Sequence, residues 1–288
     1  MDGIWMKRDS MQLREMMENH KRPGKVLAIT SGKGGVGKTN ISANLAICLA
    51  ASQKKVLLID ADFSLGNLDI LMNLNTRYRI SHFIKGRKTL EEIIHVGPEG
   101  LEIICGACGL EELADLSEFQ RQRLLKELSI LQQDNDAIVI DTAAGISKSV
   151  VSFCLAADHV LVVTTPEATA MADAYAMIKV LVGNKFSGII SLIVNMASTH
   201  TEGKKTYQQI ANVAKQFLST HIYDAGVLLR DEHLLSAVAL RKPVVLAYPK
   251  ARITSSLAAL AAKLSDGSAA RSNNIDDGFF KKVVDWFF

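Results

Sequence analysis

The residues best suited to chemistry lie in the run SGKGGVGKT at positions 31–39. The run satisfies the pattern G-x-x-x-x-G-K-[ST]. Glycines allow backbone N–H groups to close around phosphate oxygens, and the N-terminus of a following helix adds partial positive charge. Lys38 is expected to reach the β- and γ-phosphates of a nucleotide, and the hydroxyl of Thr39 to be a ligand of Mg²⁺. The run therefore predicts a phosphate site made of Gly32, Gly34, Gly35, Val36, Gly37, Lys38, Thr39 and Asn40.

Such a site needs a strand before the loop and a helix after it, and the sequence supplies both. Apolar runs that end in a polar residue occupy 25–30, 55–60, 137–141, 159–165 and 189–195. They are typical of strands buried on both faces. Segments of helical period separate or follow them, at 38–52, 118–133, 169–183, 204–219 and 253–264. This alternation predicts an α/β fold with a doubly wound, mostly parallel sheet, in which ligands bind at the carboxyl ends of the strands.

The loop carries a second lysine, Lys33, within K-G-G-V-G-K-T. With this lysine the sequence resembles the deviant Walker A ATPases, the family that includes MinD, ParA and the nitrogenase iron protein. The resemblance covers most of residues 25–264. It implies that Lys33 crosses a subunit interface and contacts the phosphates bound to a second copy. ATP would then hold together a face-to-face homodimer.

Acidic residues follow two of the expected strands in the order that the family would have them. The segment DADFSLGNLD starts at Asp60, and the segment DTAAG starts at Asp141. The resemblance implies that Asp62 orients the attacking water and that Asp60 lies near the metal. It also implies that Asp141 binds a water of Mg²⁺ and that Gly145 lets the backbone approach the γ-phosphate. Carboxylates suit both the water-orienting and the metal-binding task.

Recognition of the base is expected later in the chain. Asn195 matches the family asparagine that hydrogen-bonds adenine, because an amide can both donate and accept. The segment 226–245 resembles the family loop that closes over the base, and Arg230 and Asp231 are its candidate contacts. Leu229 stands where proline is common in the family. Adenine is favoured over guanine because the sequence has no N-K-x-D signature.

Composition limits the remaining possibilities. The net charge of +3 over 288 residues gives no reason to expect nucleic-acid binding. Four cysteines are too few for a disulfide framework, and no run approaches the ~18 apolar residues of a membrane span. The N-terminus does not resemble a secretory signal, so a cytoplasmic protein is expected. We expect an ATPase domain at 23–264, a flexible linker at 265–277 and appended segments at 1–22 and 278–288.

The C-terminal segment GFFKKVVDWFF, residues 278–288, has an amphipathic pattern. On a helix its polar residues share one sector, and aromatic and aliphatic residues fill the rest. This pattern is typical of a helix that lies in a membrane interface, here with anionic lipids as partners. Docking on the chain's own domain or in a partner's groove are the alternatives. The expected membrane residues are Phe279, Phe280, Val283, Val284, Trp286, Phe287 and Phe288.

The N-terminal segment RDSMQLREMMENH resembles the N-terminal motif of the FlhG group within this family, also called FleN or YlxH. These proteins regulate flagellar number and placement. The resemblance implies that residues 1–22 stimulate an FlhF-type GTPase, and Leu13, Arg14 and Met17 are the candidate contacts. The helical stretch 204–219 is a further candidate surface, which in the family binds flagellar C-ring proteins.

The leading hypothesis is an ATPase switch that binds the inner face of the cell membrane reversibly as an ATP-held dimer. Its hydrolysis, with Lys33, Lys38 and Asp62 as the catalytic residues, is expected to be slow, to need Mg²⁺, and to depend on dimerisation and partners. A division-site MinD is the main alternative. A ParA-type DNA-segregation ATPase is less favoured. So is an iron–sulfur carrier that would use Cys105 and Cys108 of ICGACG.

Overall fold

The computed structural model describes residues 23–62, 66–106, 118–266, 279 and 282–283. Its centre is an eight-stranded sheet in the order β3-β4-β2-β5-β1-β6-β7-β8. Only the pair β3–β4 within this sheet is antiparallel, and the remaining pairs are parallel. The strands are β1 (Lys25–Ser31), β2 (Val56–Ala61), β3 (Ile94–Val96), β4 (Glu102–Ile104), β5 (Ala137–Ala144), β6 (His159–Thr164), β7 (Ile189–Ala197) and β8 (Tyr223–Leu229).

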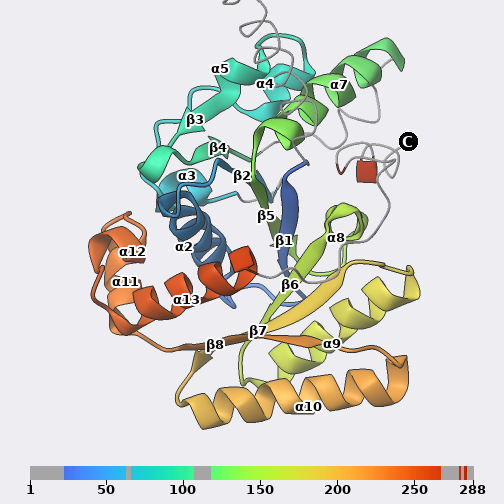
Figure 1. Cartoon of the computed structure of the whole chain (residues 1–288), viewed down its shortest axis with the longest axis vertical. Coiled ribbons are helices and arrows are strands. Elements are labelled where there is room, and N and C mark those ends of the chain that lie inside the picture. Colours follow the sequence, from blue (N-terminus) through green and yellow to red (C-terminus); the bar gives the residue numbers. More distant parts are fainter. Residues whose placement is uncertain (1–22, 63–65, 107–117, 267–278, 280–281, 284–288) are drawn as a thin grey trace, which may run out of the picture.

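Helices cover both faces of the sheet, as the doubly wound prediction requires (Figure 1). Helices α2, α11, α12 and α13 lie on one face, and α7, α8 and α9 lie on the other, while α10 packs against α9, β7 and β8. The longer helices are α2 (Lys38–Ala51), α7 (Glu118–Asp134), α8 (Lys148–Ala156), α9 (Ala168–Gly183), α10 (His200–Leu218), α11 (Glu232–Ala239) and α13 (Arg252–Asp266). The short ones are α3 (Leu68–Leu71), α4 (Ile80–Ile84), α5 (Leu90–Ile93), α12 (Val244–Ala247) and the 3₁₀ turn η1 (Pro98–Gly100).

The apolar strand runs are explained by this double cover. Along β1, Val26 and Ala28 belong to the core on the α7–α8 face, while Leu27 and Ile29 belong to the core on the α2–α13 face. All four side chains are at most 2% exposed. A strand that buries both faces cannot alternate apolar and polar residues, so its sequence reads as a continuous apolar run.

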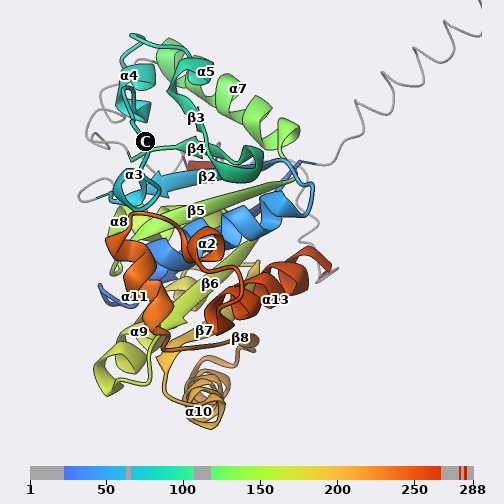
Figure 2. The same ribbon diagram turned by 90° about the vertical axis from the view of Figure 1, so that its left-hand side faces the viewer.

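Several elements were not expected from the sequence. Helix α8 lies inside an apolar stretch without a clear period, and β8 carries the mixed sequence YDAGVLL. Strand β8 forms one edge of the sheet, where half-exposed positions tolerate polar residues. Figure 2, turned by 90°, looks onto one face of the sheet, with α2 and α13 packed side by side in front of the strands.

Candidate functional site

The glycine-rich loop connects β1 to α2, as the sequence predicts. Gly37 has φ +93° and stands directly before Lys38, the first residue of α2. A Cβ at Gly37 would lie 2.5 Å from Nδ2 of Asn195, so both the backbone angle and the close approach require glycine. The first turn of α2 carries no acidic residue. Its free N–H groups are therefore available to an anion such as a phosphate.

Lys38 is the buried cation of the site. Only 8% of the residue is exposed. Burial lowers the pKa of its ammonium, and the nearby carboxylates of Asp141 and Asp62 act against that change. A lysine held in this way between an anion-binding helix end and two carboxylates is suited to contact a phosphate.

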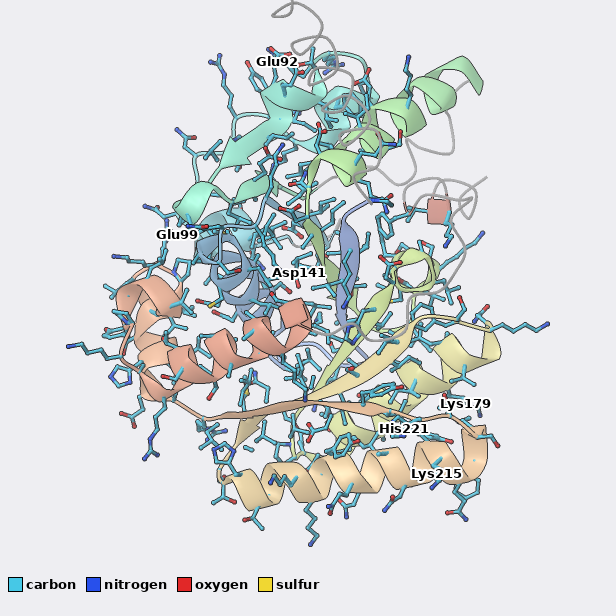
Figure 3. The ribbon with its side chains drawn as sticks, viewed as in Figure 1. Glu92, Glu99, Asp141, Lys179, Lys215 and His221 are labelled. Atoms are coloured by element: carbon cyan, nitrogen blue, oxygen red, sulfur yellow. The ribbon has the colours of Figure 1, made fainter. Side chains whose placement is uncertain are left out.

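Two aspartates lie side by side at the carboxyl ends of neighbouring strands. Asp60, the last residue but one of β2, pairs in register with Asp141 of β5, and both are almost fully buried. Burial, followed by the charge of Asp141, raises the pKa of Asp60 to about 7. Burial likewise raises the pKa of Asp141 to about 6, although hydrogen bonds from Thr39 and Ser42 act to lower it. Figure 3 labels Asp141, which lies at the centre of the molecule.

This donor set fits Mg²⁺. Mg²⁺ prefers oxygen ligands and keeps several waters, so proteins usually supply one or two carboxylates and a hydroxyl beside the nucleotide phosphates. Asp141 and the Thr39 hydroxyl, which are hydrogen-bonded to each other, meet that description. Within the described ranges there is no group of three His, Cys, Asp or Glu side chains of the kind that holds a metal unaided. The shared carboxylate–hydroxyl pair is therefore the candidate metal position.

Asp62 follows these residues at the start of the loop after β2. Its backbone N–H donates to Oδ1 of Asp60 at 3.0 Å. The backbone of Leu68, on the far side of residues 63–65, also bonds to Asp60. A Cβ at Gly66 would lie 2.5 Å from Oδ2 of Asp60. The Asp60 carboxylate thus contacts the backbone of Asp62, the candidate water-orienting residue, and that of Leu68, further along the same loop.

The second lysine of the loop is bound within its own chain. Nζ of Lys33 lies 2.6 Å from Oε1 of Glu167 and 2.8 Å from Oγ1 of Thr169. Glu167 is the residue before α9, and the side chains of the ion pair are 36% and 59% exposed. The hydrogen bond from Lys33 lowers the pKa of Glu167. To reach another subunit, Lys33 would have to leave these two partners.

A pocket of about 460 Å³ opens beside Lys33. Of the three expected base contacts, only Arg230 lines it. Asn195 is buried beneath, where its Nδ2 donates to the carbonyl of Val36 at 2.8 Å. Asp231 caps α11 through the N–H of His233 and accepts the N–H of Ile253. The lining is completed by Gly34, Gly35, Val36, Thr165, Pro166, Glu167, Met196, Ser198 and Glu202.

Met196 is a pocket residue that the sequence did not reveal. It has φ +57°, an unusual value for a residue with a side chain, at an irregularity in the β7–β8 pairing. Its Cε lies 3.6 Å from the position of a Cβ at Gly37. Only the strand's departure from regular pairing brings this side chain to the loop, and no residue-type pattern signals such a departure.

The remaining expected site residues have definite positions. Asn40 lies in the first turn of α2 and its carbonyl accepts from Asn44. Gly145, with φ +92°, donates its N–H to the carbonyl of Ser31 at 2.9 Å, so it ties the end of β5 to the loop. Burial raises the pKa of the Cys105 thiol to about 12, which disfavours the thiolate that an iron–sulfur ligand requires. Cys108 and the expected partner residues Leu13, Arg14 and Met17 lie outside the described residues.

Two apolar residues of the C-terminal segment are packed on the domain. Phe279 is 2% exposed and Val283 is 5% exposed, and both join the core on the α7–α8 face. The ring of Phe279 stacks on Phe153 of α8 with centroids 6.4 Å apart. Its N–H donates to Oε1 of Gln132 of α7 at 3.0 Å. These two residues thus have the docked alternative in this structure, and their contact with a membrane stays a prediction.

The other five expected membrane residues, Phe280, Val284, Trp286, Phe287 and Phe288, lie outside the described residues. Within the helices that the structure describes, none has the length and apolar character needed to cross a membrane.

Comparisons with known proteins agree with this geometry. A family model described as "AAA domain" matches residues 24–185. The chain is 37% identical over 254 residues to antiactivator FleN of Pseudomonas aeruginosa, with 88% of this chain and 89% of FleN covered. The chain belongs to the MinD/ParA family of deviant Walker A ATPases.

Two further proteins show how far the likeness extends. Flagellum site-determining protein YlxH of Helicobacter pylori is 37% identical over 272 residues, covering 92% of each chain. The solved structure of MinD from Pyrococcus horikoshii, complexed with Mg-ADP, has a TM-score of 0.70 at 22% identity and covers 87% of this chain and 99% of its own. The comparison with MinD shows a shared fold, and the matches to the two flagellar relatives extend over most of the length of this chain.

Proposed function

We propose that this protein is an ATP-dependent switch that regulates flagellar number or placement. The observation that carries the proposal is the loop with two lysines in different environments. Lys38 is buried beside the candidate metal residues, while Lys33 lies at the surface in exchangeable contacts. The 37% identity with FleN and YlxH supports the flagellar role over a division-site role.

The nucleotide is ATP, and the Thr39 hydroxyl and the Asp141 carboxylate would hold the Mg²⁺ that accompanies it. Mg²⁺ supplies charge neutralisation at the phosphates when it is bound. Lys38 holds the phosphates, and the α2 N-terminus orients them. Asp62, placed by its backbone bond to Asp60, orients the attacking water. Hydrolysis is slow because the site is completed by Lys33 from a second copy.

Dimerisation exchanges the partners of Lys33. In the single chain its ammonium is held by Glu167 and Thr169. Ion pairs at exposed positions contribute little free energy and are screened by salt. A phosphate on a second copy, which carries more charge than one carboxylate, can compete for the same ammonium. ATP, but not ADP, then presents the γ-phosphate that stabilises the dimer.

The C-terminal segment is the membrane-binding output, and docking on α7 and α8 is its inactive position. Helix α8 begins at Lys148, three residues after Gly145, so a movement of the β5–α8 segment is transmitted to Phe153. Burial of Phe279 and Val283 on the domain competes with their burial in lipid. Two released segments on one dimer bind a membrane together with a millimolar effective concentration.

Partner proteins have two candidate sites. The exposed side of α10 presents Val213 and Phe217, which are 38% and 66% exposed, and would contact flagellar C-ring proteins. Residues 1–22 would stimulate an FlhF-type GTPase through Leu13, Arg14 and Met17. Phe217→Ala is expected to weaken the first interaction and leave the second unchanged.

Co-sedimentation with anionic liposomes tests the proposal. Asp62→Ala slows hydrolysis, and a variant that ends at Asp277 lacks the membrane segment. The proposal expects the Asp62→Ala protein to pellet with ATP much more than with ADP, and the shortened variant to stay in solution. Equal binding in both nucleotides would make the segment a constitutive anchor. No binding in either would leave it as a docking element alone.

A further inference from the structure

Ser42 is a buried hydroxyl that neither the loop motif nor the family resemblance assigns. It lies in α2, one turn after Thr39, and is 0% exposed. Its Oγ lies 2.8 Å from Oδ1 of Asp141 and 3.0 Å from the carbonyl oxygen of Lys38. A serine inside a helix can satisfy its hydroxyl with a carbonyl of the preceding turn. The shorter distance to a carboxylate of the sheet therefore asks for a different explanation.

Two hydroxyls from the same face of α2 meet one carboxylate. Residues three apart on a helix are neighbours, so Thr39 and Ser42 both reach Asp141. Their environments differ, because Thr39 borders the anion-binding end of the helix and Ser42 has no exposed surface. Mg²⁺ needs the oxygen of Thr39 as a ligand. Ser42 lies too deep to contact phosphate, and its hydroxyl can stay on Asp141 whether or not Thr39 is used elsewhere.

We propose that Ser42 is a positioning residue for the Mg²⁺ site. Its hydroxyl donates to Oδ1 of Asp141 and so fixes the orientation of the carboxylate, leaving Oδ2 for the metal and its waters. Partners that hold a metal-binding carboxylate from behind commonly change metal affinity by ~10–100-fold when removed. The inference rests on the proposed Mg-nucleotide function. Nucleotide binding measured with and without Mg²⁺ distinguishes a failure of the Ser42 inference from a failure of the proposed function.

A purely structural role for Ser42 makes a different prediction. In that case the hydroxyl only satisfies the Lys38 carbonyl, and its loss changes folding stability without changing metal binding. Ser152 provides a matched control. It is also 0% exposed and lies in a helix, α8, and its Oγ donates to the carbonyl of Ser149 at 2.7 Å. Among the residues that the structure describes, no carboxylate is hydrogen-bonded to Ser152.

The experiment measures binding of fluorescent mant-ADP to the full chain, first in EDTA and then across a titration with MgCl₂. For Ser42→Ala we expect affinity in EDTA within about twofold of the unchanged protein. The Mg²⁺ concentration at half-maximal effect should rise about tenfold or more. Ser152→Ala should leave both quantities unchanged. Thermal unfolding in EDTA monitors the stability of each variant.

A second variant covers the case in which Ser42→Ala does not fold. Ser42→Cys keeps a donor at the same position, with a slightly larger atom, but donates a weaker hydrogen bond, so an intermediate shift of the Mg²⁺ curve is expected. An unchanged Mg²⁺ curve in whichever of the two variants folds would overturn the positioning role. Failure of the unchanged protein to bind mant-ADP with or without Mg²⁺ would instead contradict the proposed nucleotide function.

Discussion

The glycine-rich loop has a buried side and an open side, and they differ in almost every physical respect. On the buried side, Lys38, Ser42, Asp60 and Asp141 are each at most 8% exposed. The Ser42 hydroxyl contacts Asp141 and the Lys38 carbonyl, and the charge of Asp141 acts on Lys38 and on Asp60. On the open side, Lys33 meets Glu167 and Thr169 at the surface, next to a pocket. Buried polar contacts are costly to break, whereas exposed ion pairs exchange easily.

The difference assigns a task to each side. The buried side holds one ligand set in a fixed orientation, which suits phosphate and Mg²⁺. The open side holds its lysine in contacts that a competing anion can replace, which suits a change of partner. Substitutions on the buried side should therefore affect chemistry and stability within one chain. Those on the open side should affect association, and hydrolysis only through association.

The largest effect is expected from Lys38→Ala. The substitution removes the buried cation that faces the phosphates, and loss of one such group typically lowers the rate by about 10²–10³-fold. Single-turnover hydrolysis of ATP measures it. Lys55→Ala, at an exposed lysine that pairs with Glu102 at 3.5 Å, is the control and should hydrolyse ATP normally. If Lys38→Ala hydrolysed ATP at a rate within threefold of the control, the claim that the buried side takes part in hydrolysis would be contradicted.

Asp60 should make the nucleotide-free protein less stable as pH rises. Its pKa of about 7 in the fold exceeds the value of 3.8 for an unperturbed carboxyl, so the native state keeps a proton that the unfolded chain releases. The stabilisation is complete below about pH 4 and is lost as pH rises through about 7, by roughly 2–4 kcal/mol. Urea unfolding at several pH values measures this loss.

Asp60→Asn should flatten that pH dependence, because the amide does not titrate. The pKa of Asp141, raised to about 6, leaves a smaller dependence of the same sign. Glu91→Gln, at an exposed carboxylate of α5, should leave the curve unchanged. Identical curves for Asp60→Asn and the unchanged protein would contradict the raised pKa of the buried Asp60 carboxyl.

Phe153→Ala tests whether α8 links the buried side of the nucleotide loop to the docking of the C-terminal segment. Loss of the stacked pair with Phe279 should weaken docking by about 0.5–1.5 kcal/mol, or about two- to tenfold. Liposome binding in ADP should increase by a similar factor. The same substitution in the variant that ends at Asp277 should give no binding. If Phe153→Ala left liposome binding of the full chain unchanged, α8 would have no part in controlling membrane binding.

The sequence predicted the parts of this account that depend on burial and local spacing. The strands of the central sheet are continuous apolar runs because both faces are covered, and the loop follows a fixed pattern of glycine, lysine and threonine. The closeness of Asp60 and Asp141 could be predicted because the carboxyl ends of neighbouring parallel strands lie at the same edge of the sheet.

Other features arise from tertiary contacts that no local pattern carries. The contact of Asn195 with Val36 joins residues 159 positions apart. Met196 reaches the pocket through an irregular strand pairing, and Lys33 finds Glu167 across 134 positions. The docking of Phe279 depends on contacts with Phe153 of α8 and Gln132 of α7, and α8 itself lies in an apolar stretch without a clear helical period. In each case the role of a residue depends on a contact with a residue distant in the sequence, so its own type could not predict that role.

The smallest effect is expected from Glu167→Gln. Removing the charge that holds Lys33 in its own chain should strengthen the ATP-dependent dimer by no more than about fivefold, because exposed pairs contribute little. Thermal stability of the monomer should not change. Combined with Lys33→Ala, the substitution should give no gain, because no ATP-dependent dimer is expected without Lys33. A gain that persists without Lys33 would mean that Glu167 acts through another group.

Sedimentation velocity of the Asp62→Ala protein, with and without Lys33→Ala, tests the central claim most directly. The account predicts a dimer in Mg-ATP, a monomer in Mg-ADP, and a monomer in both once Lys33 is replaced, with mant-ADP affinity unchanged by that replacement. A Lys33→Ala protein that still dimerises in Mg-ATP would contradict the assignment of the open side to association. So would a Lys33→Ala protein that has lost nucleotide binding.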